Sequence, residues 1–285
     1  MKKKTQVCKK SLIVLLLKKI LFFIKAILPP KWYDAFYKFT FKIYKSLIRF
    51  CYLRFYIYYY LKGDKKNLKK TKIIYRVMPY SLVGEKGLAQ TYDLVEKVVD
   101  NNLEGGLVEC GVAQGGCAAL MASLIFEKNN QTRKLWLCDS YEGLPDPTKE
   151  DFDQKMCSTG THTQPMDKGF CLGTLEQVKQ LMLETFNFPK DKIIFVKGWF
   201  KDTLPLKNKE IGKIAILRID ADWYDSTKEC LEYLYDQVVA KGFIIIDDYG
   251  TCFGCQKAVD EFLASRGLTV EIKFDGRGGC YWIKS

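Results

Sequence analysis

The chain has 285 residues, of which 48% are hydrophobic and 27% are charged. This composition is typical of a globular protein, and it excludes wholesale disorder, a collagen-like repeat and a protein with several membrane spans. The net charge of +12 comes from residues 1–72 (20 Lys and Arg, 2 acids, +18), whereas residues 73–285 (25 and 31, −6) give no reason to expect a nucleic-acid partner.

The first candidate element is the apolar run 11–28 (SLIVLLLKKILFFIKAIL), which is long enough to cross a bilayer. Three lysines interrupt it, each costing on the order of 3 kcal/mol at the membrane centre, so a clean span is disfavoured. The Lys-rich start would also suit a signal peptide, but no small-residue cleavage site precedes Pro29 and Pro30.

Residues 32–60 are rich in aromatic side chains, and basic residues recur among them at steps of 7, 4, 3 and 4. On a helix these basic residues form one narrow stripe, consisting of Lys31, Lys38, Lys42, Lys45 and Arg49. We therefore predict an amphipathic helix that lies in the surface of an anionic membrane. The alternatives are a helical cap or homo-oligomer surface, and a true span. The Lys-rich run 62–72 marks the boundary between this extension, residues 1–72, and a catalytic domain, residues 73–285.

After residue 106 short apolar runs alternate with helical patterns. Buried parallel strands read as unbroken apolar runs, so this alternation predicts an α/β fold with a Rossmann-like, doubly wound, mostly parallel sheet. The last two runs are close enough in sequence to form an antiparallel hairpin at the sheet edge. The expected strands are 107–112, 134–139, 193–196, 214–220, 243–248, 270–274 and 280–283, and the expected helices are 117–127, 174–186, 226–240 and 255–266.

The first strand is followed by a turn that contains Gly111, Gly115 and Gly116, and the second strand ends at Asp139. Glycines let the backbone approach a ligand closely, and an acid at this position can accept the hydroxyls of a ribose. These features predict a nucleoside-containing cofactor. The turn lacks the glycine spacing that seats a pyrophosphate, so S-adenosylmethionine fits better than NAD or ATP. A turn with a purely structural role is the alternative.

Four aspartates lie at the ends of the fourth and fifth expected strands: Asp220, Asp222, Asp247 and Asp248. Carboxylates at the ends of adjacent buried strands repel one another unless a cation or a shared proton compensates them. Asp220, Asp247 and Asp248 offer only oxygen ligands, which favours Mg²⁺ over zinc. A carboxylate beside such an ion could take the proton of an acceptor hydroxyl at neutral pH. In the alternative, Asp247 and Asp248 cap the next helix and Asp222 is merely exposed.

Two other function classes remain open on these residues. Asp220, Ala221 and Asp222 resemble the DxD metal site of nucleotide-sugar glycosyltransferases, and a non-catalytic, membrane-associated module is a third possibility.

The stretch from Pro145 to Leu175 is long for a loop and suggests an active-site lid. It contains the single histidine, His162, which we expect to be solvated; an acceptor-side base is the alternative. Trp223 and Tyr224 could stack on a sugar ring or serve only in packing.

Eleven cysteines, an odd number at uneven spacing, predict free thiols in a reducing, cytoplasmic compartment. Cys252 and Cys255 have the spacing of a redox or zinc motif. No second pair and no neighbouring histidine accompanies them, so we do not expect metal or redox chemistry there.

The catalytic part of the chain resembles the macrocin O-methyltransferase family over about residues 73–285. The stretches that carry the resemblance are 107–116 (LVECGVAQGG), 139–145 (DSYEGLP), 198–205 (GWFKDTLP), 217–227 (LRIDADWYDST), 242–249 (GFIIIDDY) and 254–259 (GCQKAV). Members of this family are S-adenosylmethionine- and Mg²⁺-dependent enzymes that methylate sugar hydroxyls of natural products. The resemblance therefore implies O-methyl transfer to a sugar-containing acceptor, with lipid-linked and capsular glycans as candidates.

The resemblance also implies which residues bind the cofactor when the motifs are matched position by position. The methionine part would lie at the end of the first strand and its turn, the ribose at the end of the second strand, and the adenine after the third. In that order the implied residues are Glu109, Gly111 and Gly115, then Asp139 and Ser140, then Gly198, Trp199 and Phe200. Ser81 belongs to the implied segment that closes over the cofactor, where the family has threonine.

On the acceptor side, the resemblance implies that Asp220, Asp247 and Asp248 hold the metal and that Asp220 is the general base. The methyl group would pass directly from the sulfonium to the acceptor oxygen without a covalent intermediate. The basic, aromatic residues 1–72 lie outside the resemblance, and their expected location is the inner face of the membrane.

Overall fold

The computed structural model describes residues 29–127, 132–153 and 162–285. The chain divides into two compact units, Met1–Tyr75 and Arg76–Ser285. The assignment of residues 1–72 as an extension and of residues 73–285 as the catalytic domain stays a prediction.

The first unit contains a long helix, α2 (Pro30–Leu61), and most of α3 (Lys65–Val77). Proline is favourable at the first position of a helix, where its missing N–H has no partner to lose. The Asp64 carboxylate accepts the Asn67 N–H at 3.0 Å and so caps α3. Of the helices that the structure describes, none combines the length and the apolar character needed to cross a bilayer. Residues 11–28, considered above as a span, lie outside the described residues.

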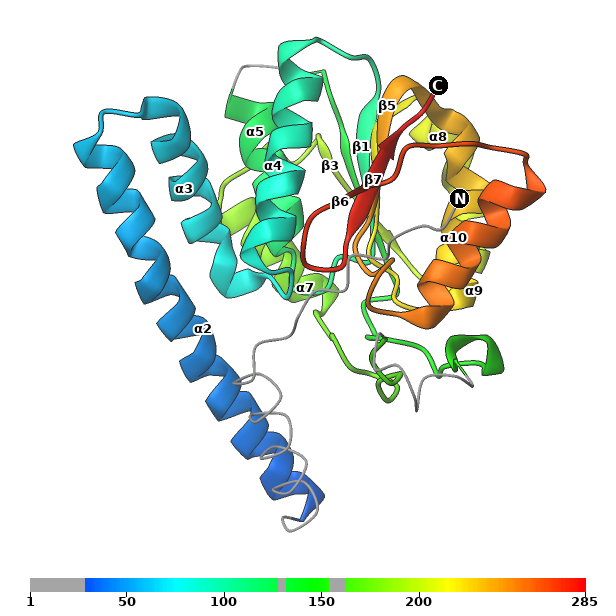
Figure 1. Ribbon diagram of the computed structural model, residues 1–285, viewed down its shortest axis with the longest axis horizontal. Helices are drawn as coiled ribbons and strands as arrows, with labels where there is room; N and C mark the ends of the chain where they lie inside the picture. Colours follow the sequence, from blue (N-terminus) through cyan, green and yellow to red (C-terminus); the bar gives the residue numbers. More distant parts are fainter. Residues whose placement is uncertain (1–28, 128–131, 154–161) are drawn as a thin grey trace, which may run out of the picture. The chain divides into compact units, whose positions relative to one another are not determined.

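The second unit contains a seven-stranded sheet with the order β3-β2-β1-β4-β5-β7-β6 (Figure 1). The first five strands are parallel, β7 is antiparallel to β5, and β6 is antiparallel to β7. The predicted doubly wound sheet with an antiparallel C-terminal hairpin is therefore confirmed. The strands are β1 (Gly106–Cys110), β2 (Leu135–Asp139), β3 (Ile193–Lys197), β4 (Ile214–Ile219), β5 (Val238–Ile246), β6 (Lys273–Phe274) and β7 (Cys280–Ile283).

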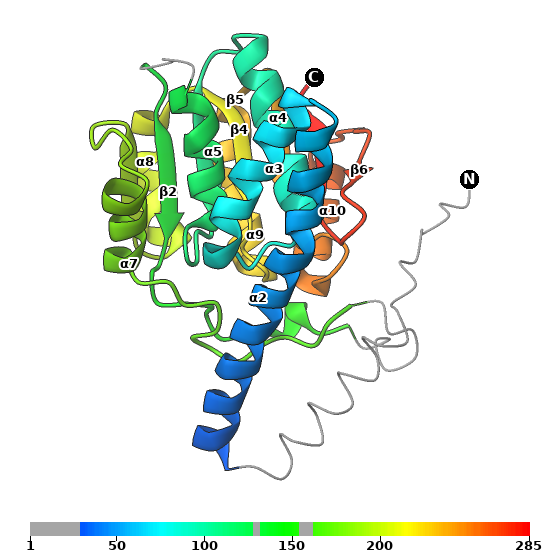
Figure 2. The same cartoon turned by 90° about the vertical axis from the view of Figure 1, so that its left-hand side faces the viewer.

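Helices cover both faces of this sheet, which explains why its central strands are apolar on both sides. One face carries α4 (Glu85–Asp100), α5 (Gly116–Glu127) and α7 (Leu175–Lys179), and Figure 2 views the molecule from this side. The other face carries α8 (Phe200–Ile211), α9 (Tyr224–Leu234) and α10 (Phe253–Ser265). Short turns of helix complete the unit: η1 (Met78–Tyr80), η2 (Lys149–Asp151), the π-helical η3 (Gln180–Thr185) and η4 (Tyr235–Gln237).

The structure differs from the sequence-based expectation at several elements. The expected helix 226–240 ends at Leu234, because Val238 already pairs with Ile214 of β4 and begins β5. The expected strand 270–274 is reduced to Lys273–Phe274. Helices α3, α4 and α8 were not expected. Pro205 is the sixth residue of α8, so the helix lacks the backbone hydrogen bond that the N–H of another residue would make there.

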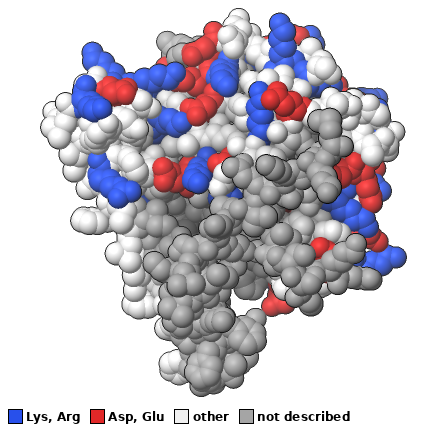
Figure 3. All heavy atoms as spheres, viewed as in Figure 1, with Lys and Arg blue, Asp and Glu red and all other residues white. Residues whose placement is uncertain are grey.

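On the molecular face drawn in Figure 3, acidic and basic side chains of the described residues lie next to one another. This mixing accords with the small excess of acids in residues 73–285.

Strand register brings the ends of four strands together. Cys110 lies beside both Cys138 of β2 and Ile219 of β4, and Ile219 lies beside Ile246 of β5. The residues that follow directly, Gly111, Asp139, Asp220 and Asp247, therefore meet at the carboxyl edge of the sheet, where doubly wound folds bind ligands.

Candidate active site

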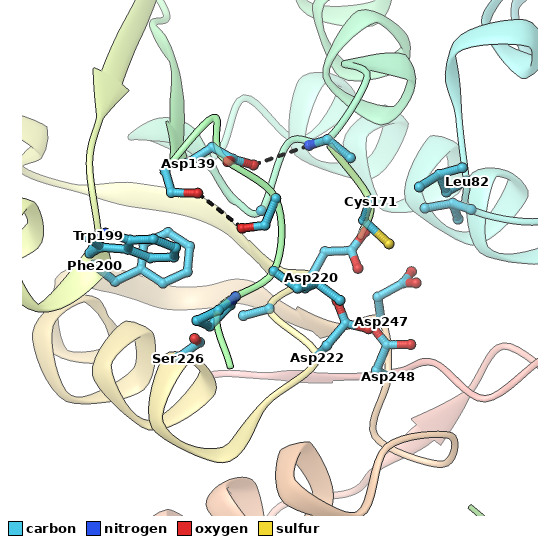
Figure 4. Close-up of a pocket in the computed structure, with 18 of the residues that line it drawn as sticks. Leu82, Asp139, Cys171, Trp199, Phe200, Asp220, Asp222, Ser226, Asp247 and Asp248 are labelled. Carbon is cyan, nitrogen blue, oxygen red and sulfur yellow. Dashed lines mark hydrogen bonds between the residues drawn. The ribbon is translucent and has the colours of Figure 1, made fainter. Parts of the chain in front are cut away.

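A pocket opens at this carboxyl edge (Figure 4). Nine of the site residues expected from the sequence line it: Gly111, Asp139, Ser140, Gly198, Trp199, Phe200, Asp220, Asp247 and Asp248. Ser81, Glu109 and Gly115 do not line it. In Figure 4 the rings of Trp199 and Phe200 lie on one side of the pocket, and the aspartates that follow β4 and β5 gather on the other.

Gly111 allows β1 and β4 to approach each other at the floor of the pocket. Its φ is +86°, and a Cβ at this position would lie 1.8 Å from the carbonyl oxygen of Asp220. The Asp220 N–H donates to the Cys110 carbonyl at 2.8 Å, which fixes this close approach. Only glycine tolerates both the positive φ and the short distance to the Asp220 carbonyl. Gly111 therefore allows the backbone of Asp220 to lie directly against the end of β1.

The Asp139 carboxylate is held by the turn that follows β1. Its Oδ2 accepts the N–H groups of Val112 (2.6 Å) and Ala113 (3.1 Å), and its Oδ1 accepts the Tyr141 N–H at 2.6 Å. Burial outweighs these bonds and raises the pKa of Asp139. A carboxylate has about four acceptor positions, so about one remains for a hydroxyl of a bound ligand.

The neighbours of Asp139 shape the same side of the pocket. The Ser140 hydroxyl donates to the Gly143 carbonyl at 3.2 Å and accepts the Glu142 N–H at 3.1 Å, so it stabilises its own turn. Trp199 precedes α8, and its carbonyl accepts the Thr203 hydroxyl at 3.0 Å. These bonds fix the backbone of the side where the sequence placed ribose and adenine.

Ser81 acts on the pocket through its neighbours. Its hydroxyl accepts the Val83 N–H at 3.0 Å, and Leu82 and Val83 line the pocket. A Cβ at Gly116 would lie 2.6 Å from the Ser81 side chain, so α5 begins in direct contact with this segment.

Glu109 is buried beside Arg218 and does not line the pocket. Its side chain is 1% exposed and lies 3.3 Å from the Arg218 guanidinium, which is 0% exposed. Burial raises the pKa of Glu109 to about 8, although Arg218 acts in the opposite direction. The contact of Glu109 with the methionine part of a cofactor, which the resemblance implies, stays a prediction.

Three carboxylates converge at the opposite side of the pocket. Asp220, Asp247 and Asp248 each offer an oxygen, and these three oxygens lie within 4.8 Å of one another. An all-oxygen donor set of this size suits a hard divalent cation such as Mg²⁺. The residues therefore fit the ion that the sequence predicted.

Two arginines already compensate part of this negative charge. Arg218 donates to Asp247 at 2.8 Å and to Asp220 at 3.0 Å, and Arg277 donates to the second oxygen of Asp247. Arg277 comes from the turn between β6 and β7. Each oxygen of Asp247 thus accepts one arginine N–H, and since a carboxylate has about four acceptor positions, Asp247 can still contribute to a cation site together with Asp220 and Asp248.

The pKa values of these three carboxylates shift in different directions. Although burial acts in the opposite direction, Arg218 and Arg277 lower the pKa of Asp247. Burial and the charge of Asp247 raise the pKa of Asp220 and of Asp248. A carboxylate with a raised pKa next to an ionised one is the arrangement expected of a general base that works near neutral pH.

Asp222 also belongs to this group of carboxylates. In one interpretation of the sequence it was merely an exposed residue. It lines the pocket, is 9% exposed, and has a φ of +54°. Burial and the charge of Asp248 raise its pKa. Asp222, Asp248 and Cys252 also form a second group of donor atoms within 4.8 Å of one another.

The structure also bears on the expectations for His162, Trp223 and the cysteines. His162 is not solvated: its side chain is 12% exposed and its Nε2 lies 2.9 Å from Gln256 Oε1. Trp223 is 4% exposed and serves in packing. The cysteines that the structure describes, Cys252 and Cys255 included, are free thiols. Part of the expected lid, residues 154–161, lies outside the described residues.

The arginines were missed by the sequence analysis, and one of them had a detectable signal. Arg218 is the only charge within the apolar run 214–219, and a charge inside a buried strand requires partners. Arg277 lies in a glycine-rich turn that carries no such signal.

Comparisons with known proteins agree with the fold and the motifs. Residues 61–284 match the family model described as macrocin-O-methyltransferase (TylF). The demethyldecarbamoylnovobiocin O-methyltransferase of Streptomyces niveus is 34% identical to this chain over 208 residues, which are 72% of this chain and 76% of that enzyme. The 8-demethyl-8-(2,3-dimethoxy-alpha-L-rhamnosyl)-tetracenomycin-C 4'-O-methyltransferase of Streptomyces olivaceus is 31% identical over 211 residues, 71% of this chain and 75% of that enzyme. The solved structure of the O-methyltransferase NovP is 32% identical, with a TM-score of 0.64, and covers 72% of this chain and 82% of its own.

Proposed function

Because the chain belongs to the macrocin-O-methyltransferase family and is therefore an O-methyltransferase, we propose that it transfers a methyl group from S-adenosylmethionine to a sugar hydroxyl. The observation that carries the proposal is the pocket itself, which has aromatic rings beside Asp139 on one side and a carboxylate cluster on the other. A sugar acceptor is supported by the relative whose name includes a rhamnosyl group. Membership of this family leaves no role for the nucleotide-sugar glycosyltransferase alternative or for a non-catalytic module.

We assign the cofactor to the side with Asp139. S-adenosylmethionine supplies a methyl group on a sulfonium, which is already a strong leaving group. The free acceptor position of Asp139 would take a ribose hydroxyl, and Trp199 and Phe200 would cover the adenine. Gly111 keeps the backbone close enough to Asp220 that the two sides of the pocket adjoin, which is the alignment that direct methyl transfer requires.

We assign the acceptor to the carboxylate side, with Asp220 as the base that takes the hydroxyl proton. Asp220, Asp247 and Asp248 would hold Mg²⁺, which lowers the pKa of a hydroxyl bound to it. Arg218 and Arg277 lower the pKa of Asp247 and so favour its ionised form, and burial together with the charge of Asp247 raises the pKa of Asp220. Asp222 is a second candidate for the base, because it is buried and also lines the pocket.

Thermal-shift titration tests both halves of this proposal. S-adenosylhomocysteine at 100 times its Kd should stabilise the protein by about 2.7 kcal/mol. MgCl₂ should add a further shift that Asp248→Asn removes, whereas S-adenosylhomocysteine should still stabilise this variant. A uridine diphosphate sugar serves as the negative control. If S-adenosylhomocysteine produced no shift, the assignment of the cofactor would fail.

We further propose that residues 1–72 hold the enzyme at the cytoplasmic face of an anionic membrane. One row of apolar side chains on α2 is exposed at spacings of 7, 4, 7, 7 and 4, so it forms a single helix face. This apolar row consists of Trp32 (72% exposed), Phe39 (64%), Ile43 (44%), Phe50 (74%), Ile57 (50%) and Leu61 (77%). The side chains of Lys31, Lys38, Lys42 and Lys45 lie outside the described part of the chain. The charge of +18 over residues 1–72 (20 Lys and Arg, 2 acids) favours anionic lipid as the partner of this row.

Sedimentation with vesicles tests the membrane proposal. The full chain should sediment with vesicles that contain phosphatidylglycerol and not with vesicles of phosphatidylcholine alone. Replacement of Phe39 and Phe50 by serine should release it, whereas the control Leu206→Ser, at an 81% exposed residue of α8, should not. Unchanged sedimentation of the double variant would contradict the proposal, and self-association without vesicles would favour the homo-oligomer alternative.

A further inference from the structure

The turn that carries Asp222 is tied to the loop that follows β2. Asp151, in η2, is 2% exposed, and its Oδ1 accepts the N–H of Tyr224, the first residue of α9, at 2.7 Å. Trp223 donates from its indole nitrogen to the Pro145 carbonyl at 3.2 Å. Both residues directly after Asp222 are therefore held by residues 145–151.

Asp222 needs such support because its own backbone is strained. Its φ is +54°, and the Trp223 N–H lies 2.5 Å from the Ala221 carbonyl, which closes a three-residue turn around Asp222. Three-residue turns with a positive φ at the central residue are rare, and for a residue with a side chain they persist only when surrounding contacts impose them. The contacts at Trp223 and Tyr224 are of this kind.

Asp151 is itself rigidly held. Its Oδ2 accepts both the N–H and the hydroxyl of Thr148, at 2.8 and 3.2 Å, as part of a capping box. Gly254, in the first turn of α10, leaves room for it: a Cβ there would lie 1.9 Å from Asp151 Oδ1 and 2.9 Å from the Tyr224 nitrogen. Any larger residue at this position would enter the bond between Asp151 and Tyr224.

We propose that Asp151 is a positioning residue for Asp222. It does not line the pocket; by holding the N-terminus of α9 it keeps the turn of residues 221–223 in the conformation that presents the Asp222 carboxylate to the pocket, beside Asp248. Gly254 is the residue that makes this contact sterically possible. The inference rests on the proposed function, because it gives Asp222 a part in the transfer site.

The test compares Asp151→Ala, Asp151→Asn and Gly254→Ala in the full chain, with Asp64→Ala as the control. Asp64 also accepts a backbone N–H at the start of a helix, but it lies in the other unit. The number of folded sites is measured by calorimetric titration with S-adenosylhomocysteine. Turnover is measured with demethyldecarbamoylnovobiocin and a panel of rhamnosides as acceptors, and amide hydrogen exchange is followed over residues 221–226.

Per folded site, Asp151→Ala and Gly254→Ala should lower kcat by about tenfold or more, because a small displacement of a reacting group is costly. The Kd for S-adenosylhomocysteine should stay within about twofold of the wild-type value, since Asp139 lies on the other side of the pocket. Asp151→Asn keeps an oxygen for the Tyr224 N–H but turns its amide NH₂ toward the Thr148 N–H, so its kcat should lie between those of wild type and Asp151→Ala. Exchange over residues 221–226 should become faster in the alanine variants and remain unchanged in Asp64→Ala.

An Asp151→Ala enzyme with unchanged kcat per folded site would overturn the inference, since a purely structural role lowers only the number of folded sites. Unchanged hydrogen exchange over residues 221–226 would overturn it independently of any acceptor. A wild-type enzyme that transferred no methyl group to any sugar would instead refute the proposed function, and the exchange measurement would then decide the inference alone.

Discussion

Replacement of Arg218 by methionine tests whether the carboxylate cluster depends on this cation. The Arg218 side chain is 0% exposed and lies 3.3 Å from Glu109, 3.0 Å from Asp220 and 2.8 Å from Asp247. Methionine keeps much of the buried volume but removes the charge. Loss of one partner from a buried ion pair costs about 3–5 kcal/mol, because the remaining carboxylate is left without compensation.

Although Arg218 contacts three carboxylates, the loss of unfolding free energy should stay within the range for a single ion pair, for two reasons. Burial raises the pKa of Glu109 to about 8. At neutral pH Glu109 is therefore largely protonated, and removal of Arg218 leaves little uncompensated charge on it. Asp247 keeps Arg277 as its second partner. For a unit of this size about 2–4 °C corresponds to 1 kcal/mol, so the midpoint of thermal unfolding should fall by roughly 6–20 °C.

The pH dependence gives the sharper result. Without Arg218, burial raises the pKa of Asp220 and Glu109 further above the values near 4 that hold in the unfolded chain. The folded variant then binds more protons than the unfolded variant, so its stability falls as the pH rises through the folded pKa values. The deficit of Arg218→Met relative to wild type should therefore be larger at pH 8 than at pH 5.

Arg133→Met is the matched control for this experiment. Arg133 is also buried, at 7% exposure, but it donates to the backbone carbonyls of Leu103 and Gly105. Its replacement should cost stability equally at both pH values. Urea unfolding of wild type and both variants at pH 5 and pH 8 measures the difference. A deficit for Arg218→Met below about 1 kcal/mol, or one that does not change with pH, would refute the reasoning.

Two further predictions concern the floor and the base of the pocket. Asp220→Asn should lower methyl transfer at least about 100-fold, as loss of a general base does, while the Kd for S-adenosylhomocysteine measured by calorimetry stays the same; normal turnover would exclude Asp220 as the base. Gly111→Ala should destabilise the protein by about 1–3 kcal/mol in urea unfolding, because its Cβ would enter the Asp220 carbonyl oxygen. The control Gly212→Ala, at a φ of +64° with no atom within 4 Å of an added Cβ, should cost less, and equal losses would show that strain alone is measured.

Much of the fold could be predicted because the chain is locally consistent. The five parallel strands were recognisable as apolar runs, and the hairpin of β6 and β7 as two runs close together in sequence. Helix α8 was missed, since Pro205 and several lysines obscure its periodicity. The start of β5 was assigned to a helix because Val238 and Val239 follow α9 without a turn signal, and only pairing with β4 decides their conformation.

The candidate site, like the fold, could be predicted from the sequence only in part. The sequence indicated which aspartates gather, because the carboxyl ends of parallel strands share one edge and the register then places Asp220 beside Asp247. It could not indicate that Glu109 pairs with Arg218, since the two residues lie on different strands that are far apart in the sequence. It also could not identify Asp151, whose partner Tyr224 is 73 residues away.

The amino-acid sequence by itself determined the class of fold, the edge of the sheet at which the candidate site lies and the family, because these depend on local periodicity and on short motifs. The tertiary structure alone decided how the charge of the cluster is balanced. Arg218 is the penultimate residue of β4 and Arg277 comes from the final hairpin, and both contact Asp247. Electrostatic compensation depends on distance in space and on burial, and neither quantity is encoded in the spacing of residues along the chain.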